Sequence, residues 1–172
     1  MIEKVLFDFL KTHNIKYELF RHNPVFTSEE NYICLDENGQ EKELVIPGTQ
    51  YKNLFLKDKK NNIFYLVTVP GEKRVDLKAL SLALGSSHFS FASAQELYEF
   101  LKIQPGSVTP FALMFDTNKK VNFILDQDFV VNPPVNFHPL RNDMTIGMAP
   151  QDFLTCMQKI GYEPKIIYIP VK

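Results

Sequence analysis

The sequence predicts an α+β protein built on a mixed, mostly antiparallel β-sheet with helices around it. Helical and β-type segments follow one another without the regular strand-helix-strand order of a doubly wound parallel sheet. At least two segments carry the signature of an antiparallel hairpin. The chain has 172 residues, of which 45% are hydrophobic, and this suits one domain with one core. We therefore expect a single domain over residues 1–172.

The first third of the chain is expected to contain two helices, a strand and a surface excursion. Apolar residues recur at helical spacing over residues 2–13, and the text "YELFR" at 17–21 predicts a strand. Thr27 with Glu30 three residues later is a capping-box pattern, which predicts a short helix. Residues 36–48 are polar and contain an Asn-Gly pair, so they predict a surface excursion with a small hairpin.

The middle of the chain contains the clearest hairpin. Two β-rich runs at 52–57 and 63–69 flank a polar turn at 58–62. The text "VDLKALSLALG" then predicts a short helix with Asp76 at its start and Gly85 at its end.

The C-terminal part begins with a second capping box, Ser93 with Glu96, which predicts another helix. A turn rich in proline and glycine follows at 105–110. A last helix is expected from Pro150 to Ile160, closed by Gly161. The strands predicted for this part of the chain lie at residues 111–115, 121–125, about 144–148 and 165–169.

Composition excludes several classes of protein. The formal net charge of −1 argues against a protein that coats nucleic acid by bulk electrostatics, and leaves room for a local contact with a nucleic-acid end. Glu3 and Asp8 interrupt the apolar pattern of the N-terminus, which predicts no signal peptide, and no apolar run reaches the roughly 18 residues of a membrane span. Cys34 and Cys156 have no metal-binding or disulfide-type spacing. We expect a cytoplasmic protein without metal or cofactor.

Three polar features stand out because the familiar catalytic motifs are absent. The sequence has no GxSxG, no phosphate-binding GxxxxGK[ST], no GxGxxG and no HExxH. The features that remain are Lys52, the loop Gly106–Pro110 and His138. Each has an ordinary structural explanation when taken alone: a solvated lysine, a turn that precedes a strand, and a hydrogen-bonded histidine.

Taken together and in order, several segments resemble the YbaK family, the stand-alone relatives of the editing domain of bacterial prolyl-tRNA synthetase. The resemblance is greatest to the prolyl-tRNA synthetase-associated alanyl-tRNA deacylases, called ProXp-ala or PrdX, and covers about residues 2–170. It implies a YbaK-like fold and hydrolysis of the ester in tRNA(Pro) mischarged with alanine, acting in trans. The matching segments are "KNLFLKDKK" at 52–60, "VDLKAL" at 75–80, "SFAS" at 90–93, "PGSVTPFAL" at 105–113, "LD" at 125–126 and "NFHPLRND" at 136–143.

The resemblance also implies roles for individual residues. The family's key lysine corresponds to Lys52, and its GxxxP loop falls on Gly106–Pro110, where backbone amides meet the aminoacyl carbonyl. The family histidine corresponds to His138, which shapes or polarises the pocket rather than acting as an obligate base. The positions that this implies for substrate binding are Asn53, Ser107, Val108, Thr109 and Pro110.

These assignments agree with the chemistry of the reaction. An aminoacyl ester is already reactive, so the enzyme has to place water and stabilise the developing oxyanion. A lysine is an ammonium at neutral pH unless it is strongly buried, so Lys52 suits a phosphate or the developing negative charge better than the role of general base. In the family mechanism the vicinal ribose hydroxyl of the substrate helps to activate the water, which explains why no triad is visible.

The sequence departs from the family pattern in one region and leaves alternatives open. Gln50 and Tyr51 stand where the family has His and Thr before the lysine, and residues 32–44 are longer and more polar than the family's. The alternatives are a deacylase for another mischarged amino acid, cysteine or serine, and a non-catalytic module that binds tRNA or a synthetase. The partners implied are the acceptor end of mischarged tRNA and prolyl-tRNA synthetase. Basic residues that are candidates for contacts with tRNA phosphates, or for a solvated hairpin tip, are Lys57, Lys59, Lys60, Lys73 and Arg74.

Overall fold

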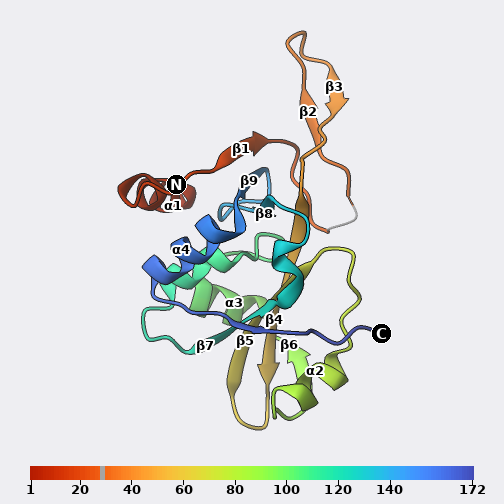
Figure 1. The fold of residues 1–172 in the computed structure, drawn as a ribbon, viewed down its shortest axis with the longest axis vertical. Coiled ribbons are helices and arrows are strands. Elements are labelled where there is room, and N and C mark those ends of the chain that lie inside the picture. Colours follow the sequence, from red (N-terminus) through yellow and green to blue (C-terminus); the bar gives the residue numbers. More distant parts are fainter. Residues whose placement is uncertain (28–29) are drawn as a thin grey trace.

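A single mixed sheet forms the centre of the molecule (Figure 1). The computed structural model describes residues 1–27 and 30–172. The strands of the main sheet are β1 Glu18–Arg21, β4 Thr49–Asp58, β5 Ile63–Pro70, β6 Phe89–Phe91, β7 Val121–Asp126, β8 Val135–Phe137, β9 Met144–Met148 and β10 Lys165–Ile167. Their order is β1-β9-β8-β4-β5-β7-β10, and β6 pairs with β4 beside this path. Antiparallel pairs outnumber parallel ones, as the sequence predicts.

The β4–β5 hairpin carries apolar side chains on both faces, and helices cover each face. Phe55 and its partner Leu66 face a cluster that includes residues of α1 (Ile2–Thr12), α3 (Ala94–Leu101) and α4 (Pro150–Ile160). Leu56 and Val67 belong to a second cluster, with residues from α2 (Leu77–Ala83) and β6. Because successive residues of a strand point to opposite faces, this one hairpin joins the two clusters.

The capping residues read from the sequence form the hydrogen bonds expected of them. The Asp76 carboxylate accepts from the backbone N–H of Ala79 at the start of α2. Ser93 and Glu96 form a complete capping box at the start of α3. Gly161 ends α4 with φ 103°, a conformation that favours glycine. The helices predicted around residues 2–13, 77–84, 94–101 and 150–160 are therefore confirmed.

The strand predicted at 111–115 is wrong. Residues Pro110–Phe115 form the 3₁₀ helix η1, with Pro110 at its first turn and Thr109 before it. Phe111 and Leu113 are fully buried, and so is Ala112 between them, so the run has no exposed face and its period does not distinguish a strand from a helix. Pro110 favours the helix, because the fixed φ of proline suits the first turn of a helix.

Smaller differences concern short elements. The last strand ends at Ile167 rather than 169. Three short elements are not predicted from the sequence: β6, β8 and the 3₁₀ helix η2 Gln127–Val130. The short helix predicted from Thr27 and Glu30 falls in part on residues 28–29, outside the described residues. The Glu30 carboxylate does accept from the backbone N–H of Thr27 at 3.0 Å, which is one half of the predicted capping box.

The polar excursion predicted for 36–48 contains the turn and the second strand of a small hairpin, and the first strand precedes it. The hairpin consists of β2 (Ile33–Leu35) and β3 (Glu41–Glu43) and forms a sheet of its own. It projects from the end of the molecule that lies opposite α2 (Figure 1). Asp36 holds its turn by accepting from the backbone N–H of Asn38 and Gln40. Throughout the described part of the chain, the helices are too short or too polar to cross a bilayer.

Candidate active site

The site forms where one edge of β4 lacks a neighbouring strand. On one edge of β4, β5 pairs with residues 51–58. On the other edge β8 pairs with Thr49 and Gln50, and β6 pairs with residues 56–58. Among the described residues, no strand pairs with 51–55 on that edge, so the sheet leaves an opening there.

A cavity of about 150 Å³ lies at this opening, and it brings Lys52, Gly106 and His138 together. The parallel β8–β4 register explains part of this convergence. It aligns Gln50 with Asn136, and continuing it by two residues sets His138, the residue that follows β8, beside Lys52. The residues that line the cavity are Phe26, Thr27, Tyr32, Gln50, Tyr51, Lys52, Asn53, Gly106, Val108 and His138.

One side of the cavity, here called the strand wall, consists of Lys52, Asn53, Gly106 and Val108. The Asn53 amide donates to the backbone carbonyl of Val108 at 3.2 Å. Its carbonyl oxygen accepts from the buried hydroxyl of Thr68 on β5 at 2.6 Å. Asn53 therefore ties the loop 106–110 to the sheet, and its side chain is engaged in positioning this loop.

Gly106 is the member of the strand wall whose backbone tolerates least change. Its φ is +90°, in the region that side chains other than glycine rarely adopt. A Cβ atom at this position would lie 3.0 Å from Cδ1 of Phe26. Glycine thus allows the loop backbone to approach the cavity beside Phe26.

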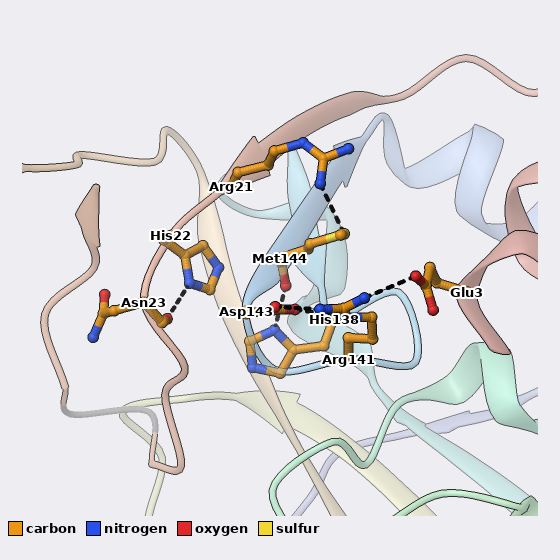
Figure 2. Close-up of polar contacts among 8 residues, drawn as sticks. All are labelled: Glu3, Arg21, His22, Asn23, His138, Arg141, Asp143 and Met144. Atoms are coloured by element: carbon orange, nitrogen blue, oxygen red, sulfur yellow. Dashed lines mark hydrogen bonds and ion pairs between the residues drawn. The ribbon is translucent and has the colours of Figure 1, made fainter. Parts of the chain in front are cut away.

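Another part of the cavity lining, here called the histidine wall, consists of His138 and the loop that follows it to Asp143. His138 Nδ1 lies 2.8 Å from the backbone carbonyl of Met144 (Figure 2). A carbonyl only accepts, so Nδ1 carries the hydrogen and Nε2 of the neutral ring has a lone pair. Burial lowers the pKa of His138, and the neighbouring His22 lowers it further. The neutral, accepting form of His138 is therefore favoured at pH 7.

A charged network holds the histidine wall in place (Figure 2). Arg141 donates to Asp143 at 2.5 Å and to Glu3 on α1 at 2.9 Å. The hydrogen bond from Arg141 holds the pKa of Asp143 below its ordinary value. The backbone N–H of His22 donates to the carbonyl of Asp143 at 3.1 Å. The loop that carries His138 is thus fixed from α1 on one side and from the segment after β1 on the other.

His22 forms a second hydrogen-bonded position behind this wall. Its Nδ1 donates to the carbonyl of Asn23 at 2.6 Å, so its Nε2 accepts from the hydroxyl of Thr145 at 2.8 Å. Its ring packs edge-on against Tyr32, with ring centroids 4.5 Å apart. Tyr32 lines the cavity, so His22 supports a second part of the cavity surface.

Three of the predicted substrate-binding residues do not line the cavity: Ser107, Thr109 and Pro110. Ser107 lies in the turn, where its backbone N–H donates to Gln104. Thr109 is fully buried before η1, and Pro110 is the first residue of that helix. Gly106 and Val108 are the loop residues that line the cavity.

The basic residues proposed for tRNA contacts do not gather at the cavity. Lys57 pairs with Glu96 at 2.6 Å. Lys73 pairs with Asp126 at 2.7 Å and with Asp128 at 2.8 Å. Lys59 and Lys60 lie in the β4–β5 turn, and Arg74 is exposed before α2.

Sequence reasoning did not assign the lining residues Phe26, Thr27 and Tyr32 to the site. Two of them fall in text that was interpreted as the start of a helix, and Tyr32 opens the excursion that departs from the family pattern. Gln50 and Tyr51 were noted only as departures. The signal that could have identified them is their position directly before Lys52, because these residues belong to the same strand β4 and lie at its N-terminal end next to the opening.

No group of three or more His, Cys, Asp and Glu side chains in the described ranges is placed to hold a metal ion. Cys156 is buried in the core, and burial raises the pKa of its thiol to about 12. It is therefore a protonated thiol at neutral pH and no nucleophile.

Known proteins with similar sequences are named for prolyl-tRNA synthetase or for prolyl-tRNA editing. The model of the aminoacyl-tRNA editing domain family matches residues 37–156. "Prolyl-tRNA synthetase associated domain-containing protein 1" of Bos taurus is 37% identical over 157 residues, which cover 89% of this chain and 86% of that protein. "Prolyl-tRNA editing protein ProX" of Acetoanaerobium sticklandii is 34% identical over 155 residues, which cover 89% of this chain and 88% of that protein.

The fold recurs in solved structures. The crystal structure of a candidate trans-editing enzyme for prolyl tRNA synthetase superposes with a TM-score of 0.67, over 99% of this chain and 97% of that chain, at 16% identity. This likeness establishes the YbaK-like fold. The family match extends over more than half of the chain and the relatives named above match most of it, so the chain belongs to the family of aminoacyl-tRNA editing domains.

Proposed function

We propose that this protein is a trans-editing deacylase that hydrolyses the ester bond of mischarged tRNA(Pro) in the cytoplasm, with Ala-tRNA(Pro) as its main substrate. The observation that carries the proposal is the cavity at the open edge of β4, which is lined by Lys52, Gly106 and His138 together. Membership of the editing-domain family supports hydrolysis of an aminoacyl ester as the reaction.

The strand wall holds the acyl group in this proposal. The backbone of the loop at Gly106 approaches the carbonyl oxygen, and the Lys52 ammonium stabilises negative charge nearby. Asn53 keeps the loop in position through Val108. Water attacks the carbonyl carbon, the bond from that carbon to the ribose oxygen breaks, and the ribose oxygen takes a proton. The products are the free amino acid and uncharged tRNA.

In this proposal the histidine wall accepts a hydrogen bond from the substrate or from the attacking water. Since Nδ1 of His138 donates to Met144, its Nε2 accepts a hydrogen bond inside the cavity. The donors that the reacting group brings are the α-ammonium, the vicinal ribose hydroxyl and the attacking water. A neutral histidine aligns one of these donors without carrying a charge that repels the α-ammonium.

The aromatic lining of the cavity supports a preference for a small side chain. The rings of Phe26, Tyr32 and Tyr51 border the cavity, and we propose that they leave room for the methyl group of alanine and exclude the proline ring. A pocket made for proline discriminates against a smaller residue by only about 1–3 kcal/mol, so a second site that admits the smaller residue corrects the error.

Deacylation of a panel of labelled aminoacyl-tRNA(Pro) species tests the proposal. Wild type should hydrolyse the alanyl species fastest and spare prolyl-tRNA(Pro), and Lys52→Ala should lower the rate about 100-fold or more. Lys11→Ala, at an exposed position of α1, is the control and should keep the wild-type rate.

The other outcomes of this assay are equally informative. Hydrolysis of cysteinyl or seryl species but not of the alanyl species would replace alanine as the substrate. Hydrolysis of no mischarged species, together with binding of tRNA, would show a non-catalytic module and reject the proposed activity.

A further inference from the structure

A second concave surface is lined by residues of β4, β6, α2 and the C-terminal segment, and it shares Lys52 with the cavity. We call it the α2 groove, and its volume is about 460 Å³. The C-terminal segment reaches it through a bridge between Val75 and Val171. The residues that line the α2 groove are Lys52, Leu54, Val75, Asp76, Leu77, Lys78, Phe91 and Lys172.

Lys52 lines both the cavity and the α2 groove. Lys52 and Leu54 project from the same face of β4, because side chains alternate along a strand. Asn53 between them points to the other face, toward Thr68 and the loop at Val108. The two concave surfaces therefore meet at Lys52, and a ligand bound in the cavity can continue past this residue into the groove.

The lining of the α2 groove is apolar with a positive rim. Its ionisable side chains are three lysines and Asp76, and the Asp76 carboxylate accepts from the backbone N–H of Ala79 at 3.0 Å. Lys78 and Lys172 are exposed. This surface complements a polyanion that also carries apolar or aromatic groups.

Phe91 gives the groove an aromatic surface that is open to solvent. Phe89 and Phe91 project from the same face of β6. Phe89 is buried in the cluster that includes Leu80 of α2, whereas Phe91 is 62% exposed. A solvent-exposed aromatic ring among cations is the arrangement on which proteins stack the bases of single-stranded nucleic acid while lysines contact its phosphates.

We propose that the α2 groove binds the single-stranded 3′ end of an RNA whose terminal ester lies in the cavity. Phe91 stacks on a base, Lys78 and Lys172 contact phosphates, and Lys52 lies where the strand passes from groove to cavity. The inference rests on the proposed function for its choice of RNA. In this proposal the α2 groove, and not the lysines of the β4–β5 hairpin, contacts the nucleic acid.

The position of the other lysines supports this choice. Lys57 and Lys73 are already paired with carboxylates. Lys59 and Lys60 lie beyond the end of β4 at Asp58, and the six residue steps from Lys52 to Asp58 span roughly 20 Å along the strand. An RNA end seated in the cavity therefore meets the α2 groove before it reaches the hairpin turn.

Fluorescence anisotropy with uncharged RNA tests the inference without requiring hydrolysis. The probes are a labelled RNA hairpin with a four-nucleotide 3′ tail and the same hairpin without the tail. Wild type should bind the tailed hairpin at least tenfold more tightly. Phe91→Ala should weaken this binding about 5- to 100-fold, which is the range for loss of one stacked base. Lys78→Glu should weaken it too and reduce the salt dependence.

Matched controls separate the groove from general effects of charge and surface. Lys11→Glu makes the same charge change on exposed α1, and Tyr98→Ala removes another exposed aromatic ring, which is 53% exposed. Both should bind the tailed hairpin as wild type does. Equal affinity of wild type for the two hairpins would overturn the inference. A larger loss with Lys59→Glu/Lys60→Glu than with Lys78→Glu would also overturn it, and would place the contact at the hairpin turn.

The assay also distinguishes failure of the inference from failure of the proposed function. If wild type hydrolyses no mischarged tRNA but prefers the tailed hairpin through Phe91 and Lys78, the groove is an RNA site and the deacylase proposal is rejected. If wild type hydrolyses Ala-tRNA(Pro) and the groove variants bind and hydrolyse as wild type does, the deacylase stands and the groove inference is rejected.

Discussion

The strand wall and the histidine wall face the same cavity but are held by different interactions. The strand wall rests on the backbone pairing of β4 with β5 and on neutral hydrogen bonds of Asn53. The histidine wall rests on ion pairs of Arg141 with Glu3 and Asp143, and its histidine has a pKa lowered by burial. Neutral hydrogen bonds are insensitive to pH and salt, whereas partly exposed ion pairs and histidines are not. We infer that pH and salt act on the site through the histidine wall.

Among changes to the groups that hold the two walls in place, the largest effect is expected from a side chain at Gly106 in the strand wall. Gly106→Ala places a Cβ 3.0 Å from Phe26 at φ +90°, and a displacement of about 1 Å in a substrate-positioning loop can lower activity about 100-fold. The measurement is kcat/KM for deacylation. Gly39→Ala is the control, since Gly39 also has positive φ but a Cβ there would meet nothing within 4 Å. Equal losses in both variants would show that backbone strain, and not the contact with Phe26, is responsible.

Asn53→Ala should weaken the strand wall itself. The change leaves the Val108 carbonyl and the buried Thr68 hydroxyl without their partner, which costs about 1–3 kcal/mol of unfolding free energy. Activity should fall about tenfold because the loop is released. Urea unfolding and kcat/KM measure the two effects.

A double mutant separates these two effects of Asn53. Adding Thr68→Val removes the unpaired hydroxyl and should restore part of the stability of Asn53→Ala without restoring activity. If activity recovered together with stability, Asn53 would act on the fold as a whole and not on the loop.

Acid should act on the histidine wall. Burial lowers the pKa of His138 and of His22, so below about pH 6.5 the unfolded chain binds more protons than the folded chain. The free energy of unfolding should therefore be highest above that pH and should decline as the pH falls towards 5. Activity should decline over the same range as His138 Nε2 becomes protonated and stops accepting.

Urea unfolding between pH 5 and 8 checks this expectation. His138→Asn should flatten the profile, and His88→Gln at an exposed position should keep it as in wild type. A wild-type profile that is flat over this range would contradict the assignment of a buried neutral His138.

The smallest effect is expected from Glu3→Gln, which removes one charge behind the histidine wall. The Glu3 side chain is only 7% exposed, but glutamine keeps an oxygen that accepts from Arg141, and Arg141 retains its ion pair with Asp143. The loss should therefore be about 1 kcal/mol. Thermal unfolding at low and high salt measures it. The largely exposed pair Lys4–Asp8 provides the control Asp8→Asn, which should change neither stability nor activity by a measurable amount. A loss with Glu3→Gln that high salt leaves unchanged would show that the ion pair is not its cause.

The sequence predicted most of the elements because their signals are local. Capping residues such as Asp76 and Ser93 identify helix starts from a few neighbouring residues, and the β4–β5 hairpin has alternating β-rich runs around a polar turn. η1 was missed because its buried run has no period, and β8 because three residues give too little pattern. The parallel pairing of β8 with β4 joins residues that are far apart in the sequence, so no local pattern reveals it.

The site could be predicted in part for the same reason. The resemblance picked out Lys52, Gly106 and His138, which the cavity brings together, while their catalytic roles remain predictions for the assays above. Tyr32 and Phe26 could not be found, because they reach the cavity only through the course of the chain after β1. The engagement of Asn53 with Val108 and Thr68 also depends on three-dimensional contacts that spacing does not reveal.

The alternation of side chains along β4 makes the site sensitive to the length of the chain as well as to its composition. Lys52 and Asn53 are neighbours that serve opposite faces of one sheet. Inserting or deleting a single residue before Lys52 would exchange these faces, so the cation would turn toward the buried hydroxyl of Thr68 and the amide toward the groove. A homologue with a one-residue gap at this point can therefore keep both residue types in an alignment and still have lost the site, which gives a simple criterion for sorting inactive relatives from active ones.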